Sequence, residues 1–228
     1  MSVPRRLHRV RWTCALLGLC ALAGCARRDV IQLHYLSGFV PGTHDIFLPA
    51  HIAVAPIGGD LASGVHEVGG IYDPTGHLEK GLQVADAGAV VHDALMTGLA
   101  DAGLKPIALD APVSPGDLSA GVDVMLTCNL QQLMSEKNFA AQQTIHGQYF
   151  TMSSRVGLKC TLQRRDGSIA CENELTGVEE EPPKPVGAEV FLPLESDPAE
   201  SLSVALSRAV GALVLDPQFR AAFPPRAP

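Results

Sequence analysis

The apolar and polar positions after residue 50 predict a folded unit of alternating strands and helices. Residues 51–57 are apolar on both faces of the expected strand, which is typical of a buried strand. Residues 58–81 contain seven glycines and are expected to form a long loop. A helix is predicted within residues 84–102, because apolar residues recur there at helical spacing, at Val91, Leu95, Leu99 and Ala102. Gly103 stands where a C-terminal cap is expected, and residues 104–109 return as a short strand.

Three later segments alternate between apolar and polar residues and predict an antiparallel meander. They are residues 122–130, 155–163 and 169–175, and each places its apolar residues on one inward face. The second and third are joined by a hairpin turn that ends in Asp166-Gly167. Residues 131–154 are expected to extend the strands around a polar loop.

The last part of the chain predicts a second helix that covers this sheet. Residues 179–185 are acidic and rich in proline, so we expect them to break the sheet. Asp197 is a typical N-cap residue and is followed by Pro198 and Glu200. The helix carries an apolar stripe of Leu202, Leu206, Val210 and Leu213. The order of elements therefore predicts an α+β fold, a single domain with a mixed or antiparallel sheet of about 4–5 strands covered by two helices.

The first 24 residues have the pattern of an export signal. Four arginines precede the apolar run at residues 12–23, which is shorter than the roughly 20 apolar residues that span a bilayer. The run ends in the lipobox pattern Leu22, Ala23, Gly24 and Cys25. The cysteine thiol accepts a diacylglycerol, and the small residues before it give a peptidase access to the bond that it cuts. We therefore expect a lipoprotein signal peptide at residues 1–24 and lipid on Cys25, where two or three acyl chains give stable anchoring.

Removal of the signal peptide leaves 204 residues (228 minus 24), enough for one domain. We expect a lipidated N-terminus and tether at 25–49, a domain at 50–223 and a tail at 224–228. Ala26 stands where enterobacterial lipoproteins that stay in the inner membrane carry aspartate. By this resemblance, the protein is expected at the outer membrane, with its domain facing the periplasm.

The mature chain is strongly acidic. The signal peptide contains four of the 17 Lys and Arg residues and no acidic residue, so the mature net charge is 13 minus 24, or −11. This balance argues against nucleic-acid binding and against a polybasic attachment to anionic lipid. Arg27 and Arg28, directly after the expected anchor, are placed to touch lipid headgroups.

Three cysteines of the mature domain are expected on the inward face of the meander, in an oxidising compartment. The first prediction is a cross-strand disulfide between Cys160 and Cys171, with Cys128 buried and free. A tight two-residue turn at Asp166-Gly167 would instead place Cys160 opposite Asn173, and Cys128 could then pair with either of the others. Three reduced thiols in the core are the remaining alternative.

The usual catalytic signatures, such as GxSxG, the P-loop and GxGxxG after a strand, do not occur in this sequence. We therefore expect a non-catalytic protein without a cofactor or a bound metal. The alternative is a metal-binding or hydrolytic periplasmic enzyme that uses histidines of the 58–92 region. Its candidate ligands are His66, Glu67, His77 and His92, which lack the spacing of HExxH.

Three stretches of the domain resemble a known group of bacterial lipoproteins. They read "HIAVAPIGGD", "ALMTGLADAGLKPI" and "GVDVMLTCNLQQL" and lie within residues 51–134. Their order of strand, helix and strand is similar to small outer-membrane lipoproteins of the YajG type, to LpoB-type activators of peptidoglycan synthases and to CsgG lipoproteins of curli secretion. The resemblance implies an adaptor, or an accessory factor for assembly or transport, that binds an envelope protein partner.

Overall fold

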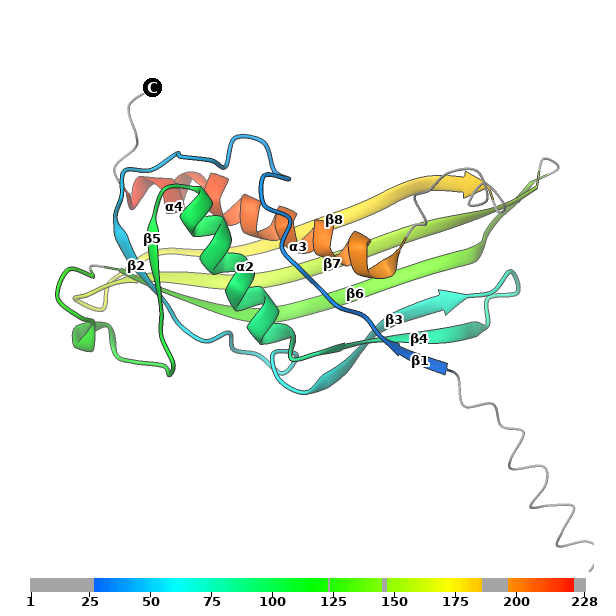
Figure 1. The fold of residues 1–228 in the computed structure, drawn as a ribbon, viewed down its shortest axis with the longest axis horizontal. Helices are drawn as coiled ribbons and strands as arrows, with labels where there is room; N and C mark the ends of the chain where they lie inside the picture. The colour runs from blue at the N-terminus through cyan, green and yellow to red at the C-terminus, as the bar shows by residue number, and fades with distance from the viewer. Residues whose placement is uncertain (1–26, 123, 145–146, 186–196, 224–228) are drawn as a thin grey trace, which may run out of the picture.

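A long antiparallel meander of β6 (Val124–Thr144), β7 (Gly147–Arg164) and β8 (Ile169–Pro185) forms the centre of the fold (Figure 1). The computed structural model describes residues 27–122, 124–144, 147–185 and 197–223. Leu126 faces Leu162 across β6 and β7, and Leu158 faces Leu175 across β7 and β8. The three segments predicted from alternation therefore pair as an antiparallel meander, with apolar residues opposite one another.

Two separate groups of strands share the other edge of β6. β2 (His51–Val54) runs parallel to the start of β6 and carries β5 (Lys105–Ala108) on its far side. β3 (Val65–Tyr72) runs parallel to β6 farther along and continues into β4 (Leu78–Ala85) and β1 (Arg27–Val30). The described residues therefore form one mixed sheet of eight strands.

The connection between β2 and β3 passes very close to β6. The amide of Gly58 donates to the carbonyl of Cys128 at 2.9 Å. A Cβ atom on Gly59, where φ is +100°, would lie 2.6 Å from the carbonyl oxygen of Leu130. Glycine is required here because the two backbones approach so closely.

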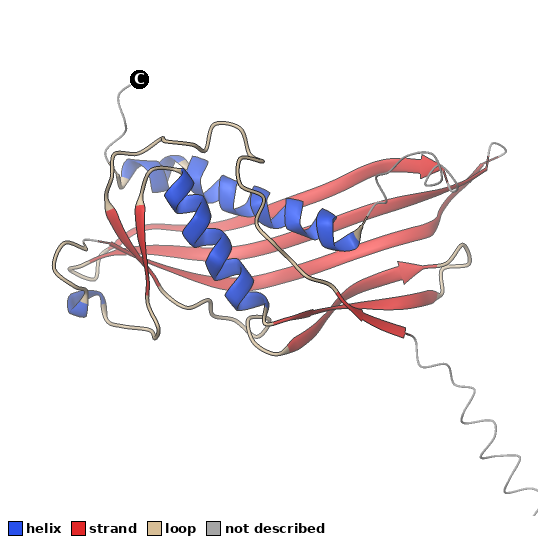
Figure 2. Cartoon of the chain, in the orientation of Figure 1, coloured by secondary structure: helices blue, strands red, loops and turns tan. Residues whose placement is uncertain are grey.

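The helices α2 (Ala87–Asp101) and α3 (Pro198–Leu215) lie on the same face of the sheet, and the short α4 (Pro217–Ala221) follows α3 (Figure 2). The side chain of Asp197 accepts a hydrogen bond from the amide of Ala199 at 2.9 Å, which confirms the expected N-cap. By length and hydropathy α3 could cross a membrane, but it is 67% buried within the protein. It is a core helix.

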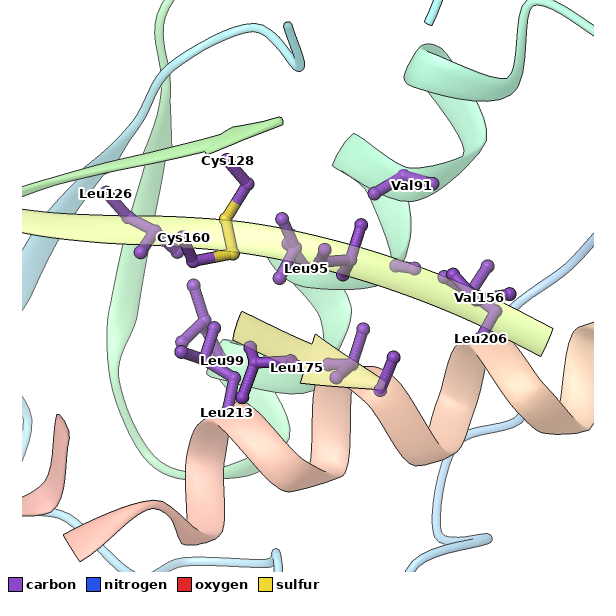
Figure 3. Close-up of a cluster of buried hydrophobic side chains, with 14 of the residues drawn as sticks. Val91, Leu95, Leu99, Leu126, Cys128, Val156, Cys160, Leu175, Leu206 and Leu213 are labelled. Atoms are coloured by element: carbon purple, nitrogen blue, oxygen red, sulfur yellow. A yellow bond between two sulfur atoms is a disulfide. The ribbon is translucent and has the colours of Figure 1, made fainter. Parts of the chain in front are cut away.

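The core lies between these helices and the sheet (Figure 3). The predicted stripe of α3 is confirmed, because each of its four residues is at most 1% exposed. The stripe belongs to the same core cluster as Val91, Leu95 and Leu99 of α2. The sheet contributes Leu126, Val156, Leu158 and Leu162 to this cluster. Gly98 of α2 allows the two helices to cross closely, since a Cβ atom there would lie 2.4 Å from Val210. At the opposite face of the sheet, a small cluster of Ala53, Leu118, Val122 and Met125 is buried.

The predicted fold class was wrong in its number of elements. The described residues form eight strands and three α-helices, not 4–5 strands and two helices. The expected loop at residues 58–81 contains β3 and the start of β4. Gly69 and Gly70 lie within β3, where neighbouring strands approach too closely for a side chain. A Cβ atom on Gly69 would lie 2.1 Å from the carbonyl oxygen of Ser135 in β6.

The acidic segment at residues 179–185 also differs from the prediction, because it continues β8 to Pro185. In the described part of the chain β8 pairs only with β7, so a proline there removes no hydrogen bond to a second neighbour. A register shift between Phe150 and Met152 accommodates the prolines between Glu181 and Lys184.

The segment predicted as a tether is folded from Arg27 onward. β1 pairs in parallel with β4, and Leu33 and Phe47 are 8% and 1% exposed. The ring of Phe47 lies 6.1 Å from that of Phe219 and 5.5 Å from that of Phe223, measured between centroids. The domain boundary expected at residue 50 was therefore placed too late. The strand and the buried side chains of this segment are widely spaced in the sequence, so they form no regular apolar pattern.

Candidate functional site

The start of β1 lies next to the predicted lipid attachment site. Cys25 is outside the described residues, and Arg27 follows it by two positions. Consecutive Cα atoms are about 3.8 Å apart, so the Cα atom of Arg27 lies within about 8 Å of that of Cys25. A lipid on Cys25 would therefore bring this end of the sheet to a membrane surface.

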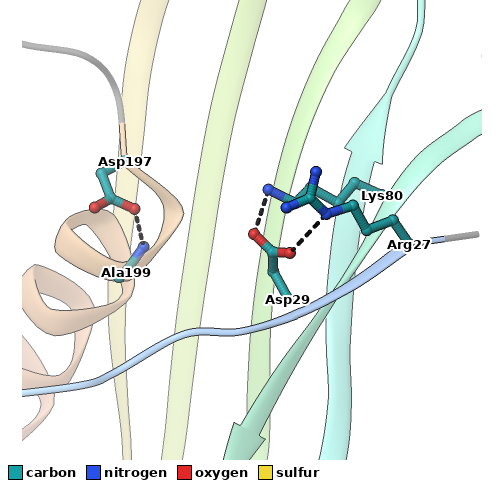
Figure 4. Close-up of polar contacts among 5 residues, drawn as sticks. All are labelled: Arg27, Asp29, Lys80, Asp197 and Ala199. Carbon is teal, nitrogen blue, oxygen red and sulfur yellow. Dashed lines mark hydrogen bonds and ion pairs between the residues drawn. The ribbon is translucent and has the colours of Figure 1, made fainter.

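Charged side chains gather around β1 and β4 at this end (Figure 4). The carboxylate of Asp29 forms ion pairs with Lys80 and with Arg27, whose Nε atom lies 3.7 Å away. Arg28 pairs with Glu67 of β3 at 2.9 Å. Because the side chain of Arg27 is 84% exposed and that of Lys80 is 30% exposed, these pairs contribute little to stability. They place two basic groups beside one carboxylate.

A hollow of about 370 Å³ opens beside this cluster. Its wall combines basic, acidic and apolar side chains from four strands, namely Arg27, Ile71, Glu79, Lys80, Lys137 and Phe139. The ammonium group of Lys137 lies 4.5 Å from the ring centroid of Phe150 and 5.3 Å from that of Phe139. These cation–π contacts fix the lysine without removing its charge.

The histidines of the alternative metal site do not come together. His66 hydrogen-bonds through Nε2 to the carbonyl of Ser63 at 2.6 Å, and His77 lies in the turn after β3, 3.4 Å from the hydroxyl of Thr75. His92 belongs to α2. Among the described residues, no group of three or more His, Cys, Asp and Glu side chains is arranged to hold a metal ion.

His92 borders a second hollow, of about 380 Å³, between the β2–β3 connection and the first turns of α2. Its Nε2 atom is buried and has no hydrogen-bond partner among the described residues, while Nδ1 lies 3.9 Å from Asp93. Small and apolar residues form most of the remaining wall, including Ala62, Gly88 and Leu109. Apart from Asp93, no other titratable side chain lines this hollow among the described residues.

The disulfide joins Cys128 to Cys160, so the first prediction of a Cys160–Cys171 bridge was wrong. The register places Cys160 opposite Asn173 and opposite Cys128, with Cα atoms of the two cysteines 4.1 Å apart. The alternative in which Cys160 faces Asn173 and Cys128 takes part in the bridge is the one that the structure shows.

Cys171 keeps a free thiol that is 5% exposed. Burial raises its pKa, and the nearby charge of Asp216 raises it further. Since the thiolate is the reactive form, this environment makes Cys171 a poor nucleophile. The residue belongs to the core.

Comparisons with known proteins leave the family open. No protein-family model and no curated protein matches the sequence. Among solved structures, the chain is similar to a DUF330-family protein from Xanthomonas campestris, with 12% identity, a TM-score of 0.48 and coverage of 82% of this chain and 95% of that one. A lipoprotein from Neisseria meningitidis matches with 16% identity and a TM-score of 0.32, over 63% and 92% of the two chains.

A third similar structure is a hypothetical protein from Chlamydia trachomatis, with 8% identity, a TM-score of 0.42 and coverage of 73% and 94%. Likenesses at this level assign neither a family nor a function. The resemblance to YajG-, LpoB- and CsgG-type lipoproteins stays a prediction.

The sequence predicts Arg27 and Arg28 near lipid headgroups, and it does not point to Lys80 and Lys137, which line the hollow beside Arg27. Each of these lysines is an isolated basic residue in its own segment of the sequence. Only the pairing of β1, β4, β3 and β6 brings them to one place. No local motif could have shown this cluster.

Proposed function

We propose that this protein is a lipid-anchored lipoprotein of the bacterial envelope that acts as a non-catalytic adaptor or an accessory factor for assembly or transport. The observation that carries the proposal is the lipobox at Leu22–Cys25, followed two residues after its cysteine by the first strand of the domain. Attachment at the outer membrane, with the domain facing the periplasm, is part of the proposal.

The disulfide supports an exported location. Stable disulfides form in oxidising compartments such as the periplasm and are rare in the cytosol. Cys128 and Cys160 lie directly opposite each other on neighbouring strands, both at most 1% exposed. Their position agrees with a domain that folds after export.

The adaptor role is supported by the open face of the sheet. The face of β7 and β8 that points away from α2 and α3 carries exposed polar side chains, among them Glu172, Glu174 and Thr176. Lys159 of β7 pairs with Glu172 at 2.7 Å on this face. An exposed, charged surface of this kind fits a protein partner better than a small substrate.

Labelling with radioactive palmitate tests the anchor. Wild-type protein should incorporate label and fractionate with membranes, whereas Cys25→Ser should remain an unlabelled, unprocessed precursor, because a hydroxyl does not replace the thiol in lipid transfer. Cys171→Ser is the matched control and should be labelled like wild type. Palmitate incorporation that persists in Cys25→Ser would show that the anchor assignment is wrong.

Photo-crosslinking of the full-length protein in cells tests the adaptor role. A photoreactive residue at Glu174 lies on the open sheet face, and one at Thr97 lies on the exposed side of α2 as a control. We expect a specific crosslinked envelope protein from position 174 and less or none from position 97. A search that yields no crosslinked partner from Glu174, Lys159 or Thr176 would contradict a partner on this face.

A further inference from the structure

Three basic side chains lie in one row across the sheet at the end that carries the proposed anchor. Arg27 of β1 is the register partner of Lys80 in β4, and Lys80 is the partner of Ile71 in β3. Ile71 is in turn the partner of Lys137 in β6. Directly paired residues point to the same face of a sheet, so the four side chains share one face. With strands about 4.8 Å apart, the row spans roughly 14 Å.

The row forms most of the wall of the hollow of about 370 Å³ described above, and Glu79 and Phe139 complete it, so basic residues outnumber acidic ones by three to one in this wall. Arg27 and Lys80 are held at its rim by the carboxylate of Asp29. Lys137 is held by the rings of Phe139 and Phe150. The basic groups are therefore already gathered at the hollow before any ligand arrives.

With lipid on Cys25, the end of the row at Arg27 would lie close to the lipid headgroups. The headgroup layer on each side of a bilayer is about 5–8 Å thick. Arg27 lies within about 8 Å of the proposed lipidated residue, measured between Cα atoms. A protein with a mature net charge of −11 thus presents three of its 13 basic residues together where it would meet the membrane.

We infer that this hollow binds the phosphate of an anionic phospholipid headgroup from the membrane that carries the anchor. Arg27 and Lys80 would contact phosphate oxygens, since guanidinium and ammonium groups are the usual phosphate ligands in proteins. Ile71 and Phe139 would face the start of the apolar acyl chains. The inference rests on the proposed lipid attachment at Cys25 and names a second contact between the domain and the membrane.

A tryptophan in the hollow provides the measurement. The only tryptophan, Trp12, is in the signal peptide, so mature protein carrying Phe139→Trp has one fluorescent indole at the site. The lipidated protein is reconstituted in phosphatidylcholine vesicles with and without phosphatidylglycerol, each with a trace of lipid that carries a spin label on its headgroup. The control, Ile107→Trp, places the indole on β5, and this residue is 39% exposed.

We expect the spin label to quench the indole at position 139 strongly when phosphatidylglycerol is present and weakly without it, and to leave the indole at position 107 unaffected. Neutralising one basic group, in Lys80→Gln or Lys137→Gln, should weaken docking about fivefold. Lys105→Gln on β5 is the matched neutral control, and circular dichroism melts confirm that each variant is folded.

Three results would overturn the inference. The first is absence of quenching at position 139. The second is quenching that is equal in both kinds of vesicle and insensitive to Lys80→Gln. The third is binding of inorganic phosphate at position 139 that vesicles containing phosphatidylglycerol do not displace, which would indicate a site for free phosphate. Intact mass spectrometry of the reconstituted protein reports the acyl chains separately. Failure of the anchor itself is therefore distinguishable from failure of the headgroup site.

Discussion

The disulfide between Cys128 and Cys160 is expected to contribute about 4 kcal/mol to the free energy of unfolding. The two cysteines are 32 residues apart in the sequence. In the chain-entropy model, closing a loop of about this length in the unfolded chain is worth roughly 4 kcal/mol at 25 °C. Both residues are at most 1% exposed, and after reduction the two thiols still fill the core as small apolar groups. The loss should therefore come mainly from the unfolded state.

Guanidinium unfolding of the mature lipidated protein in a mild detergent, followed by circular dichroism, measures this contribution. Reduced wild type and the double variant Cys128→Ala/Cys160→Ala should lose similar amounts of stability relative to oxidised wild type. Cys171→Ala is the control, because it removes a buried thiol without removing the bridge, and reductant should still lower its stability by about 4 kcal/mol. An unfolding midpoint that does not change on reduction would refute the reasoning.

Further predictions concern the helix packing and one turn. Leu206→Ala should cost about 2–5 kcal/mol in a denaturant melt, because the side chain is 1% exposed, and a change below about half a kcal/mol would contradict its place in the core. Gly177→Ala should cost about 1–3 kcal/mol, since a Cβ atom would lie 1.8 Å from a backbone oxygen of α3, whereas Gly116→Ala meets open space and should be neutral in the same melt. The pKa of Asp73 is lowered mainly by a hydrogen bond from the Thr75 side chain and next by one from the His77 amide. The ionised carboxylate therefore stabilises the turn at pH values above the ordinary carboxyl pKa. This stabilisation is lost as the pH falls through the lowered pKa. NMR titration should show this pKa rising toward its usual value in Thr75→Ala, and an unchanged pKa would contradict the assignment.

The elements with a clear period could be predicted from the sequence. Helical spacing identified α2 and α3, and alternation identified the inward residues of β6 and β7, because both patterns are set by neighbours within one element. The hairpin near Asp166-Gly167 shows the limit of such reasoning. There a register shift between Leu162 and Gln163 leaves Ile169 56% exposed, although alternation placed it inward.

The assembly of the sheet could not be predicted in the same way. β3 contains Gly69 and Gly70, which read as loop residues until β6 is known to lie against them. β1 has only four residues, Arg27–Val30, and three of them are polar or charged, so its pairing with β4 leaves little trace in the pattern. The basic row depends on the same pairings, because Arg27, Lys80 and Lys137 are each more than 50 residues apart in the sequence.

The folded N-terminal segment changes what kind of adaptor the protein can be. A free tether over residues 25–49 could reach roughly 80 Å when extended, at about 3.3 Å for each residue. Because β1 already pairs with β4 at Arg27, that reach is reduced to about 8 Å between Cα atoms. With lipid on Cys25, the domain would remain at the membrane surface, and a partner would have to come to it. Insertion of a flexible Gly-Ser segment between Ala26 and Arg27 should therefore preserve the fold and the lipid but weaken both headgroup docking and crosslinking to the partner, and unchanged docking and crosslinking would show that this placement is not required.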